Sequence, residues 1–427
     1  MSPPRPTVEV IGHRLDPAHY RVRDFLTRIA QPYDWYEAGS DEADRMLSGH
    51  GIAAGSLPVV IDGDDVITGA TAADLARAWN VETEPTRTHY DIAIVGAGPA
   101  GLAAAVYAAS DGLSTLLIER EVPGGQAAYT SLIENFFGFP DGIGGAELAR
   151  RAGRQAERFG ADLVLLRGVV GHDVAPDGRF RLDLGGELSV TATIVIATPG
   201  MEWRRLEVPG LEELLDRGVY YNAGRSEAAQ CGGDGVVVVG AGNSAGQAVL
   251  NLAQAGARVR MVVRGDDLSK SMSAYLVDRI EANPLIEVQL GSQVVDVHAD
   301  AGHLSGVTIA DGRDDAERHD AQAMFVCIGA DPRTGWAARA GVEADARGYI
   351  LTGPDLLEAG RRPAAWRLER DPLTLETSVP GFFAAGDVRS GSTKRVAGAV
   401  GEGAMAVALA HRRLAELERL PTPSGGG

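Results

Sequence analysis

The chain has 427 residues, of which 45% are hydrophobic, and its formal net charge is −18. This length predicts two to four domains at about 100–200 residues each, and the excess of carboxylates disfavours nucleic acid and anionic membranes as partners. The sequence contains no run of about 18 apolar residues, so it predicts no membrane span. The opening "MSPPRPTVEV" lacks the features of a secretory signal. We therefore expect a cytoplasmic protein.

The cysteines and histidines of this sequence do not form the patterns that indicate a disulfide framework or a metal site. Cys231 and Cys327 are the two cysteines of the sequence, too few for a disulfide framework or a Cys-rich metal site. The nine histidines lack ligand spacing with each other or with cysteine. We therefore predict no metal site.

Residues 8–80 have the pattern of a complete small α/β unit. In chain order they predict a strand, a helix, a strand, a helix, two strands that form a hairpin at Asp62-Gly63, and a helix with Thr71 as its N-cap. Residues 81–88, "VETEPTRT", are polar and read as a linker.

A glycine motif follows the apolar strand that begins near residue 89. Gly96-Ala97-Gly98-Pro99-Ala100-Gly101 lies between this strand and a helix, the context that a dinucleotide-binding turn requires. Gly96 permits the tight turn, Gly98 lets a pyrophosphate approach the backbone, and Gly101 lets the helix pack closely on the strand. Glu119 ends the next strand, where its carboxylate can accept hydrogen bonds from a ribose.

A second motif of the same kind, Gly240-Ala241-Gly242-Asn243-Ser244-Ala245, follows the strand "GVVVV" and opens another helix. The next strand runs to Arg264, where a carboxylate is absent. A basic residue at this position suits a 2'-phosphate, which favours NADPH, with NADH as the alternative. The competing interpretation of Arg264 is a solvated surface charge.

The C-terminal region has the features of a flavin-binding half. A buried strand runs into Gly386-Asp387, where a carboxylate can bind ribityl hydroxyls, and Gly401-Glu402-Gly403 is expected to open a helix whose N-terminus can stabilise negative charge on a reduced flavin. Two nucleotide sites in one chain suggest a flavin in one and a hydride donor in the other.

Several segments together resemble the low-molecular-weight thioredoxin reductases, over roughly residues 89–415. They are "GAGPAGLAAAVYA" (96–108), "GGQ" (124–126), "IENFFGFP" (133–140), "VVGAGNSAGQA" (238–248), "IGADPRT" (328–334) and "TSVPGFFAAGD" (377–387). The resemblance implies FAD, NADPH, a homodimer, and an NADPH domain that is inserted in the FAD domain and rotates against it. It also implies contacts to FAD from Gly96, Gly98, Gly101, Glu119, Gly125, Gln126, Asn135 and Asp387, and from the backbone of Arg395, Val396 and Ala397. The motifs themselves add Pro99, Ala100 and Gly386 on the flavin side, and Gly240, Gly242, Asn243, Ser244, Ala245 and Arg264 on the NAD(P)H side.

The sequence departs from that family where the redox chemistry should be. The family places Cys-x-x-Cys just before the second glycine turn, and this chain has Asn222-Ala223-Gly224-Arg225 there. Thiol exchange needs a thiolate, which none of these residues can supply. Cys231 lies six residues past that position with no cysteine near it in the sequence, and Cys327 lies in an apolar strand where cysteine packs as a small hydrophobe. A redox pair of the two, or a single reactive Cys231, is therefore disfavoured.

The first unit shows a parallel loss. Its element order, and "SLPVVI" with Pro58 in the cis position, resemble a glutaredoxin or thioredoxin fold, which places Cys-Pro-x-Cys at the start of its first helix. This chain has Asp16-Pro17-Ala18-His19 instead. We expect a binding or docking module, and we expect His19 to be a surface residue and not a catalytic base.

The predicted fold class is therefore α/β: a thioredoxin-like domain followed by two doubly wound Rossmann-type domains. The predicted divisions are a thioredoxin-like domain (1–80), a linker (81–88), the FAD domain (89–202 and 331–415), the inserted NAD(P)H domain (203–330) and a disordered tail (416–427). Residues 353–375 read as an insertion, and its Arg361, Arg362, Trp366 and Arg367 are candidates to contact cofactor or partner or to cover the dimer surface.

The leading functional prediction is a flavoprotein oxidoreductase in which hydride passes from NADPH to FAD. Electrons then go directly to an unidentified acceptor, such as a redox protein or a quinone, and we predict no catalytic side chain. Two alternatives remain: a non-catalytic FAD-binding redox sensor or docking protein, and a thioredoxin-disulfide reductase that relies on a partner's cysteines.

Overall fold

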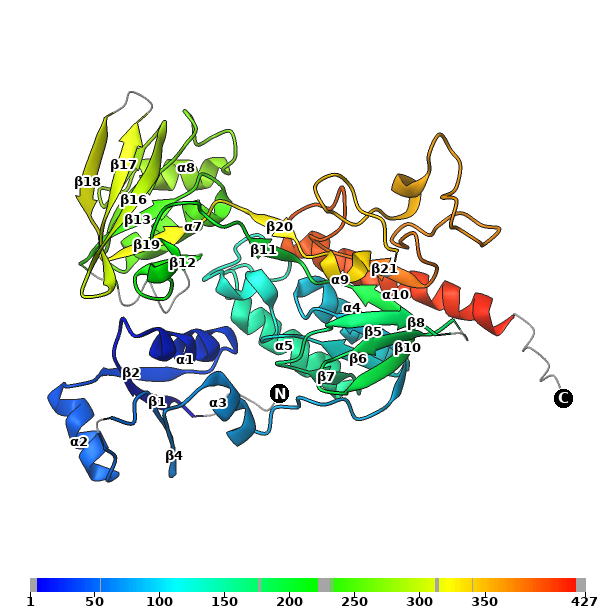
Figure 1. Ribbon diagram of the computed structural model, residues 1–427, viewed down its shortest axis with the longest axis horizontal. Coiled ribbons are helices and arrows are strands. Elements are labelled where there is room, and N and C mark those ends of the chain that lie inside the picture. Colours follow the sequence, from blue (N-terminus) through cyan, green and yellow to red (C-terminus); the bar gives the residue numbers. More distant parts are fainter. Residues whose placement is uncertain are drawn as a thin grey trace.

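The computed structural model describes residues 6–53, 55–175, 178–221, 231, 233–311, 315–339 and 341–419. Figure 1 shows three bodies: an N-terminal unit, a domain around a seven-stranded sheet, and a domain around a five-stranded parallel sheet. The positions 222–225, where the family's dithiol is expected, lie outside the described residues.

The N-terminal unit has the predicted element order. It comprises β1 (Val8–Gly12), α1 (Pro17–Arg28), β2 (Tyr33–Glu37), α2 (Asp41–Gly49), β3 (Val59–Asp62), β4 (Asp65–Thr68) and α3 (Ala72–Ala78). The sheet order is β2-β1-β3-β4, with β1 parallel to β2 and antiparallel to β3. Asp16 caps α1 and Thr71 caps α3. The Leu57–Pro58 peptide bond is cis, as predicted.

The seven-stranded domain is built from two separate parts of the chain. The first part gives β5 (His89–Val95), α4 (Pro99–Ser110), β6 (Thr115–Ile118), the 3₁₀ turn η1 (Gly125–Tyr129), α5 (Gly145–Arg158), β7 (Asp162–Val164), β8 (Gly171–Val174), β9 (Phe180–Asp183) and β10 (Ser189–Ala197). The second part gives α9 (Gly335–Ala338), η3 (Gly353–Leu356), β21 (Phe382–Ala384) and α10 (Val396–Glu418). The sheet order is β7-β6-β5-β10-β9-β8, and β21 pairs with β10.

The five-stranded domain lies between those two parts. It contains η2 (Glu212–Leu214), β12 (Val219–Tyr221), β13 (Gly235–Val239), α7 (Asn243–Gln254), β14 (Arg258–Val262), α8 (Ala274–Glu281), β15 (Ile286–Gln289) and β19 (Ala323–Val326), in the sheet order β12-β19-β13-β14-β15. A three-stranded sheet of β16 (Ser292–Asp300), β17 (His303–Asp311) and β18 (Ala316–Asp320) covers one side. The chain passes between the two larger domains twice, and the two connecting segments form an antiparallel pair of β11 (Met201–Trp203) and β20 (Ala330–Pro332).

Continuous apolar runs such as "GVVVV" form the central parallel strands because helices or sheets cover both faces. Both strand–glycine turn–helix units therefore place their turns at the carboxyl edge of a parallel sheet, where open α/β sheets bind ligands.

Helix α10 corrects two predictions. It begins at Val396, so Gly401-Glu402-Gly403 lies inside the helix and does not open it. The reason is packing: a Cβ on Gly403 would lie 2.1 Å from the carbonyl oxygen of Ala100 on α4. The helix also continues to Glu418, so the predicted disordered tail is wrong for 416–418, whereas residues 420–427 lie outside the described part.

The insertion at 353–375 packs against the end of α10 (Figure 1). Arg370 forms ion pairs with Glu376 at 2.6 Å and with Glu416 at 2.6 Å, and Trp366 donates a hydrogen bond to the Arg370 carbonyl. The basic residues predicted as candidate contacts, Arg361, Arg362 and Arg367, do not line the cavity described below. The insertion therefore fastens the C-terminal helix.

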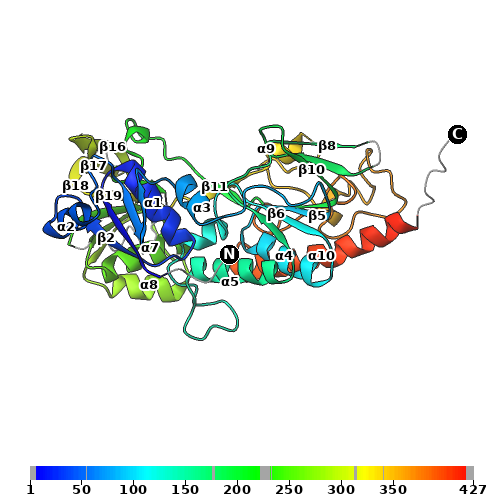
Figure 2. The same ribbon diagram turned by 90° about the horizontal axis from the view of Figure 1, so that it is seen from below.

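The N-terminal unit contacts both larger domains (Figures 1 and 2). Arg14 bonds Asp234 at 2.9 Å and Arg21 bonds Asp216 at 3.2 Å, and both partners belong to the five-stranded domain. Tyr20 packs on Tyr220 of that domain with ring centroids 4.9 Å apart. From the end of the same helix, Arg28 reaches Glu121 of the seven-stranded domain.

Within the described residues, none of the helices has both the length and the apolar character that crossing a membrane requires. In the same part of the chain, no group of three or more His, Cys, Asp or Glu side chains gathers where it could hold a metal ion.

Candidate functional site

The first glycine turn joins β5 to α4, and each glycine has its own role. Gly96 has φ +106°, and a Cβ on it would lie 2.3 Å from the Thr198 carbonyl oxygen. A Cβ on Gly101 would lie 1.9 Å from the Gly96 carbonyl oxygen. Gly98 is the N-cap of α4, has no protein atom near its missing Cβ, and lines a cavity. An uncapped helix N-terminus that opens into a cavity suits a phosphate.

Glu119 follows β6 at the edge of the same cavity. Its Oε2 accepts a hydrogen bond from the Ala97 amide at 2.8 Å, and its Oε1 accepts one from the Glu121 amide at 3.0 Å. A carboxylate has about four acceptor positions, so capacity remains for the hydroxyls of a ribose. Burial is the largest influence on this carboxyl and raises its pKa, while the two amides and Arg28 oppose that rise.

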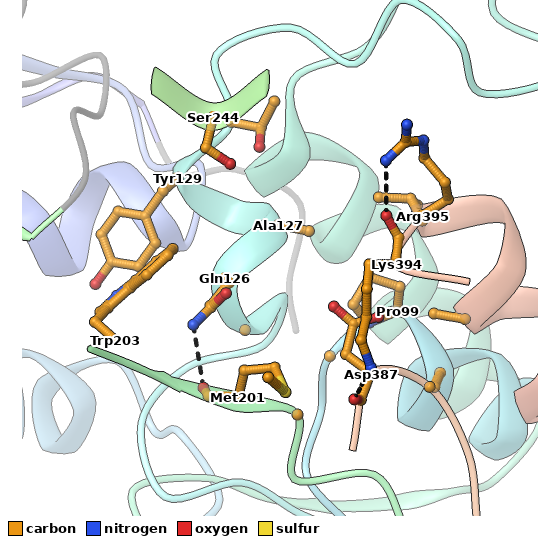
Figure 3. A pocket seen from close by; sticks show the side chains of 18 of the residues that line it. Pro99, Gln126, Ala127, Tyr129, Met201, Trp203, Ser244, Asp387, Lys394 and Arg395 are labelled. Carbon is orange, nitrogen blue, oxygen red and sulfur yellow. Dashed lines mark hydrogen bonds between the residues drawn. The ribbon is translucent and has the colours of Figure 1, made fainter. Parts of the chain in front are cut away.

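The loop after Glu119 forms a second wall. Gly125, Gln126 and Asn135 line the cavity, and the Gln126 amide donates to the Met201 carbonyl at 3.1 Å. Tyr129 and Trp203 meet edge to face, with centroids 6.4 Å apart, across the cavity from Asp387 (Figure 3).

The C-terminal wall is formed by the residues after β21 and by the start of α10. Gly386 donates its amide to Glu402, which is also held by Arg389 at 2.6 Å. Asp387 lies beside Lys394, which bonds to its carbonyl (Figure 3). Burial raises the pKa of Asp387 above its ordinary value, and Lys394 partly offsets that rise. Arg395 is the N-cap of α10, and its side chain caps no amide.

These walls enclose a cavity of about 490 Å³ that also reaches the second glycine turn. Asn243, Ser244 and Gln247 of α7 line it, and Asn243 Oδ1 accepts a hydrogen bond from the Ser273 amide at 2.7 Å. The N-terminus of α7 has no side-chain cap. The N-termini of α4 and α7 therefore face one space, which is the arrangement needed to bring two bound dinucleotides together.

The structure places most of the predicted residues around this cavity. Lining it are Gly98, Pro99, Ala100, Glu119, Gly125, Gln126, Asn135, Asn243, Ser244, Gly386, Asp387, Arg395 and Val396. Behind or beside the lining are Gly96, Gly101, Gly240, Gly242, Ala245 and Ala397. Arg264 is exposed, two residues after β14, and does not line the cavity.

Other lining residues escaped the sequence analysis. They include Arg28, Tyr129, Met201, Trp203, Ser273, Tyr275, Arg333 and Lys394. Lys394 directly precedes the predicted Arg395, so its position could have suggested it. Arg28 had no such signal, because it belongs to a different body of the protein and meets Glu121 only in the folded chain.

Neither cysteine lines this cavity. Cys231 and Cys327 are both buried, belong to one apolar cluster of the five-stranded domain, and are not joined in a disulfide. Burial in apolar surroundings disfavours a thiolate, which weakens the alternative of a reactive Cys231.

His19 corrects a prediction, because it is 5% exposed and not a surface residue. Its Nδ1 accepts a hydrogen bond from the His13 amide at 2.8 Å, and burial lowers the pKa of its imidazole. Residue 19, where the predicted glutaredoxin-like fold would carry its second cysteine, is therefore a buried, hydrogen-bonded imidazole.

Comparison with known proteins agrees with this geometry. The profile of the pyridine nucleotide-disulphide oxidoreductase family matches residues 90–403. The chain belongs to this family. It is 32% identical over 335 residues to the thioredoxin reductase of Bacillus subtilis, covering 77% of this chain and 96% of that protein. It is 34% identical over 329 residues to the thioredoxin reductase of Treponema pallidum, covering 75% and 95%.

Solved structures give the same result. The thioredoxin reductase of Lactococcus lactis in its FR conformation has a TM-score of 0.67 and 29% identity, and covers 77% of this chain and 99% of that chain. The thioredoxin reductase of T. acidophilum has a TM-score of 0.66 and 29% identity, and covers 77% and 100%. This family member is therefore an oxidoreductase and a flavoprotein of thioredoxin reductase type.

Proposed function

We propose that this oxidoreductase takes hydride from NADPH, passes it to FAD, and delivers the electrons from the flavin directly to an acceptor without a thiol relay. The acceptor class that we propose is a quinone or a redox protein. The observation that carries the proposal is the single cavity onto which both uncapped helix N-termini open, in a chain without cysteine at 222–225.

The residues present fit the two dinucleotides. Gly98 and Gly125 leave the floor of the cavity free of side chains, Glu119 keeps acceptor capacity, and Asp387 stands at the far wall. When bound, FAD supplies the two-electron chemistry. The helix N-termini would hold the phosphates, Glu119 would hold the ribose, and the start of α10 would offer positive potential.

An anaerobic titration with NADPH, and separately with NADH, tests the proposal. We expect added NADPH to bleach the absorbance of the oxidised flavin. Quinones and ferredoxins can then be screened as acceptors. If dithionite bleaches the flavin but neither nucleotide does, the hydride path is absent, and the redox sensor becomes the better interpretation.

We predict that the purified enzyme does not reduce protein disulfides. With NADPH and an oxidised thioredoxin, turnover should remain at the buffer rate, because 222–225 carry no thiol and both cysteines of the chain are buried. Disulfide reduction that persists in Cys231→Ser would contradict this prediction and favour a partner's cysteines as the relay.

Arg264 tests the choice of nucleotide. Replacing it with Ala should raise KM for NADPH about 5- to 10-fold, the usual loss for one charge-assisted contact to a phosphate. KM for NADH should not change, because NADH has no 2'-phosphate. Equal KM changes for both nucleotides, or none, would assign Arg264 to the solvated surface.

We further propose that residues 1–80 are a thioredoxin-like docking module and that the enzyme is a homodimer. The β-α-β-α-β-β-α order and the cis Pro58 support the thioredoxin-like docking module.

The apolar side chains of Tyr107 on α4 and Met405 on α10, each 50% exposed, support the homodimer. Light scattering should give twice the mass of one chain.

A further inference from the structure

We propose that Arg28 of the N-terminal unit is a positioning residue for the ribose-binding carboxylate Glu119, so that the FAD site is complete only when the N-terminal unit is docked. This inference rests on the FAD binding proposed above. It assigns to the N-terminal unit a function that needs no redox cysteine.

Arg28 is held in place from several sides. It lies in the last turn of α1, where the helix dipole favours a cation, and it is 7% exposed. Its guanidinium lies 4.9 Å from the centre of the Tyr129 ring and 3.6 Å from Asp24. A cation buried this deeply needs its partners in place.

The main partner of Arg28 is on the other body. Arg28 NH1 donates a hydrogen bond to Glu121 Oε2 at 2.7 Å. The two residues are 93 positions apart in sequence, and the bond crosses the interface between the N-terminal unit and the seven-stranded domain. Burial raises the pKa of Glu121, but the charge and hydrogen bond of Arg28, together with the charge of Arg120, leave this pKa below its ordinary value. Glu121 is therefore an ionised group, held on Oε2 by the buried Arg28 and on Oε1 by the half-exposed Arg120 at 2.9 Å.

Glu121 is coupled in turn to the ribose acceptor. Its amide donates to Glu119 Oε1, while the Ala97 amide of the glycine turn holds Glu119 Oε2. Two carboxylates two residues apart repel each other, and Arg28 supplies the compensating charge. All three side chains line the cavity. Without Arg28, compensation of Glu121 would fall to Arg120 alone, which pairs with its other oxygen at 2.9 Å but is 49% exposed. We expect Glu119 then to lose affinity for ribose hydroxyls.

The test is the dissociation constant of FAD, measured by flavin fluorescence on full-length apoprotein. We expect Arg28→Gln to raise it about tenfold, which is typical for the loss of one charge-assisted contact. FMN lacks the adenosine ribose, so its dissociation constant should not change. Arg28→Lys should recover part of the FAD affinity, because it restores the positive charge.

Arg21→Gln is the matched control. Arg21 lies on the same helix and joins the N-terminal unit to Asp216, which does not line the cavity. The Arg21 side chain is 71% exposed, so its pair with Asp216 adds little to the docking of the N-terminal unit, and we expect wild-type affinity for FAD. If Arg28→Gln does not fold, Arg28→Met fills the same space without charge and should show the same tenfold loss.

Three results would overturn the inference: wild-type FAD affinity in the folded Arg28 variants, equal weakening of FAD and FMN, or equal weakening by Arg21→Gln. A wild-type protein that takes up no FAD would overturn the proposed function as well.

Discussion

Replacing Arg370 by Met is expected to lower the free energy of unfolding by about 3–5 kcal/mol, the usual cost of leaving one charge of a buried pair without its partner. Glu376 is completely buried. It accepts hydrogen bonds from both terminal nitrogens of Arg370 and from the amides of Leu373 and Gly381. Methionine preserves the volume and removes the charge. Urea denaturation followed by circular dichroism measures the loss.

Arg362 provides the comparison within the same insertion. It pairs with Asp371 at 3.0 Å, but the two side chains are 42% and 64% exposed. Arg362→Met should therefore cost about 0–1 kcal/mol, as for other solvated ion pairs. Similar losses in both variants would mean that Glu376 does not depend on Arg370 for compensation. FAD affinity should be unchanged in both, since neither arginine lines the cavity.

Replacing Gly98 by Ala is expected to give a folded protein that has lost its flavin. No protein atom lies within 4 Å of the Cβ that would be added, so the apoprotein should fold as before. That Cβ would project into the cavity, where backbone must approach a pyrophosphate closely. We expect FAD affinity to fall about 100-fold or more, measured by the flavin content of the purified protein and by fluorescence titration.

The equivalent change in the second turn separates the two nucleotides. Gly242→Ala also meets no protein atom within 4 Å. It should keep FAD and lose the rapid bleaching by NADPH. A Gly98→Ala protein that purifies with wild-type flavin content would contradict the assignment of the first turn to FAD, and exchanged phenotypes would mean that the two turns bind the opposite cofactors.

The features that could be predicted from sequence are those fixed by local spacing. Each glycine turn lies between a strand and a helix, and Glu119 follows at the expected distance, because each depends on backbone within one β-α-β unit. The start of α10 was misplaced for a different reason. Glycines usually end or open helices, but Gly403 is needed inside α10 to let it approach α4.

Contacts that form only in the folded protein left no pattern in the sequence. His19 was predicted to be a surface residue because its partners, the His13 amide and the His13 ring that stacks on it at 5.8 Å, meet it only in the folded unit. Arg28 looked like one of several basic residues on α1. Its role depends on how the N-terminal unit docks, and side chains far apart in the chain determine that docking.

The connection after α3 has a consequence for competition. The Leu165 amide donates to the Glu82 carbonyl, Arg167 bonds to the Thr83 carbonyl, and Asp162 holds the Thr86 amide, so residues 82–86 run as a fixed strap along the seven-stranded domain. A unit held by so short a connection has an effective concentration on the order of millimolar at its own docking face. A soluble protein at micromolar concentration cannot displace it from Asp216 and Tyr220 without far tighter binding. We therefore expect that face to stay occupied by the chain's own N-terminal unit, so that the electron acceptor proposed above would approach from another side.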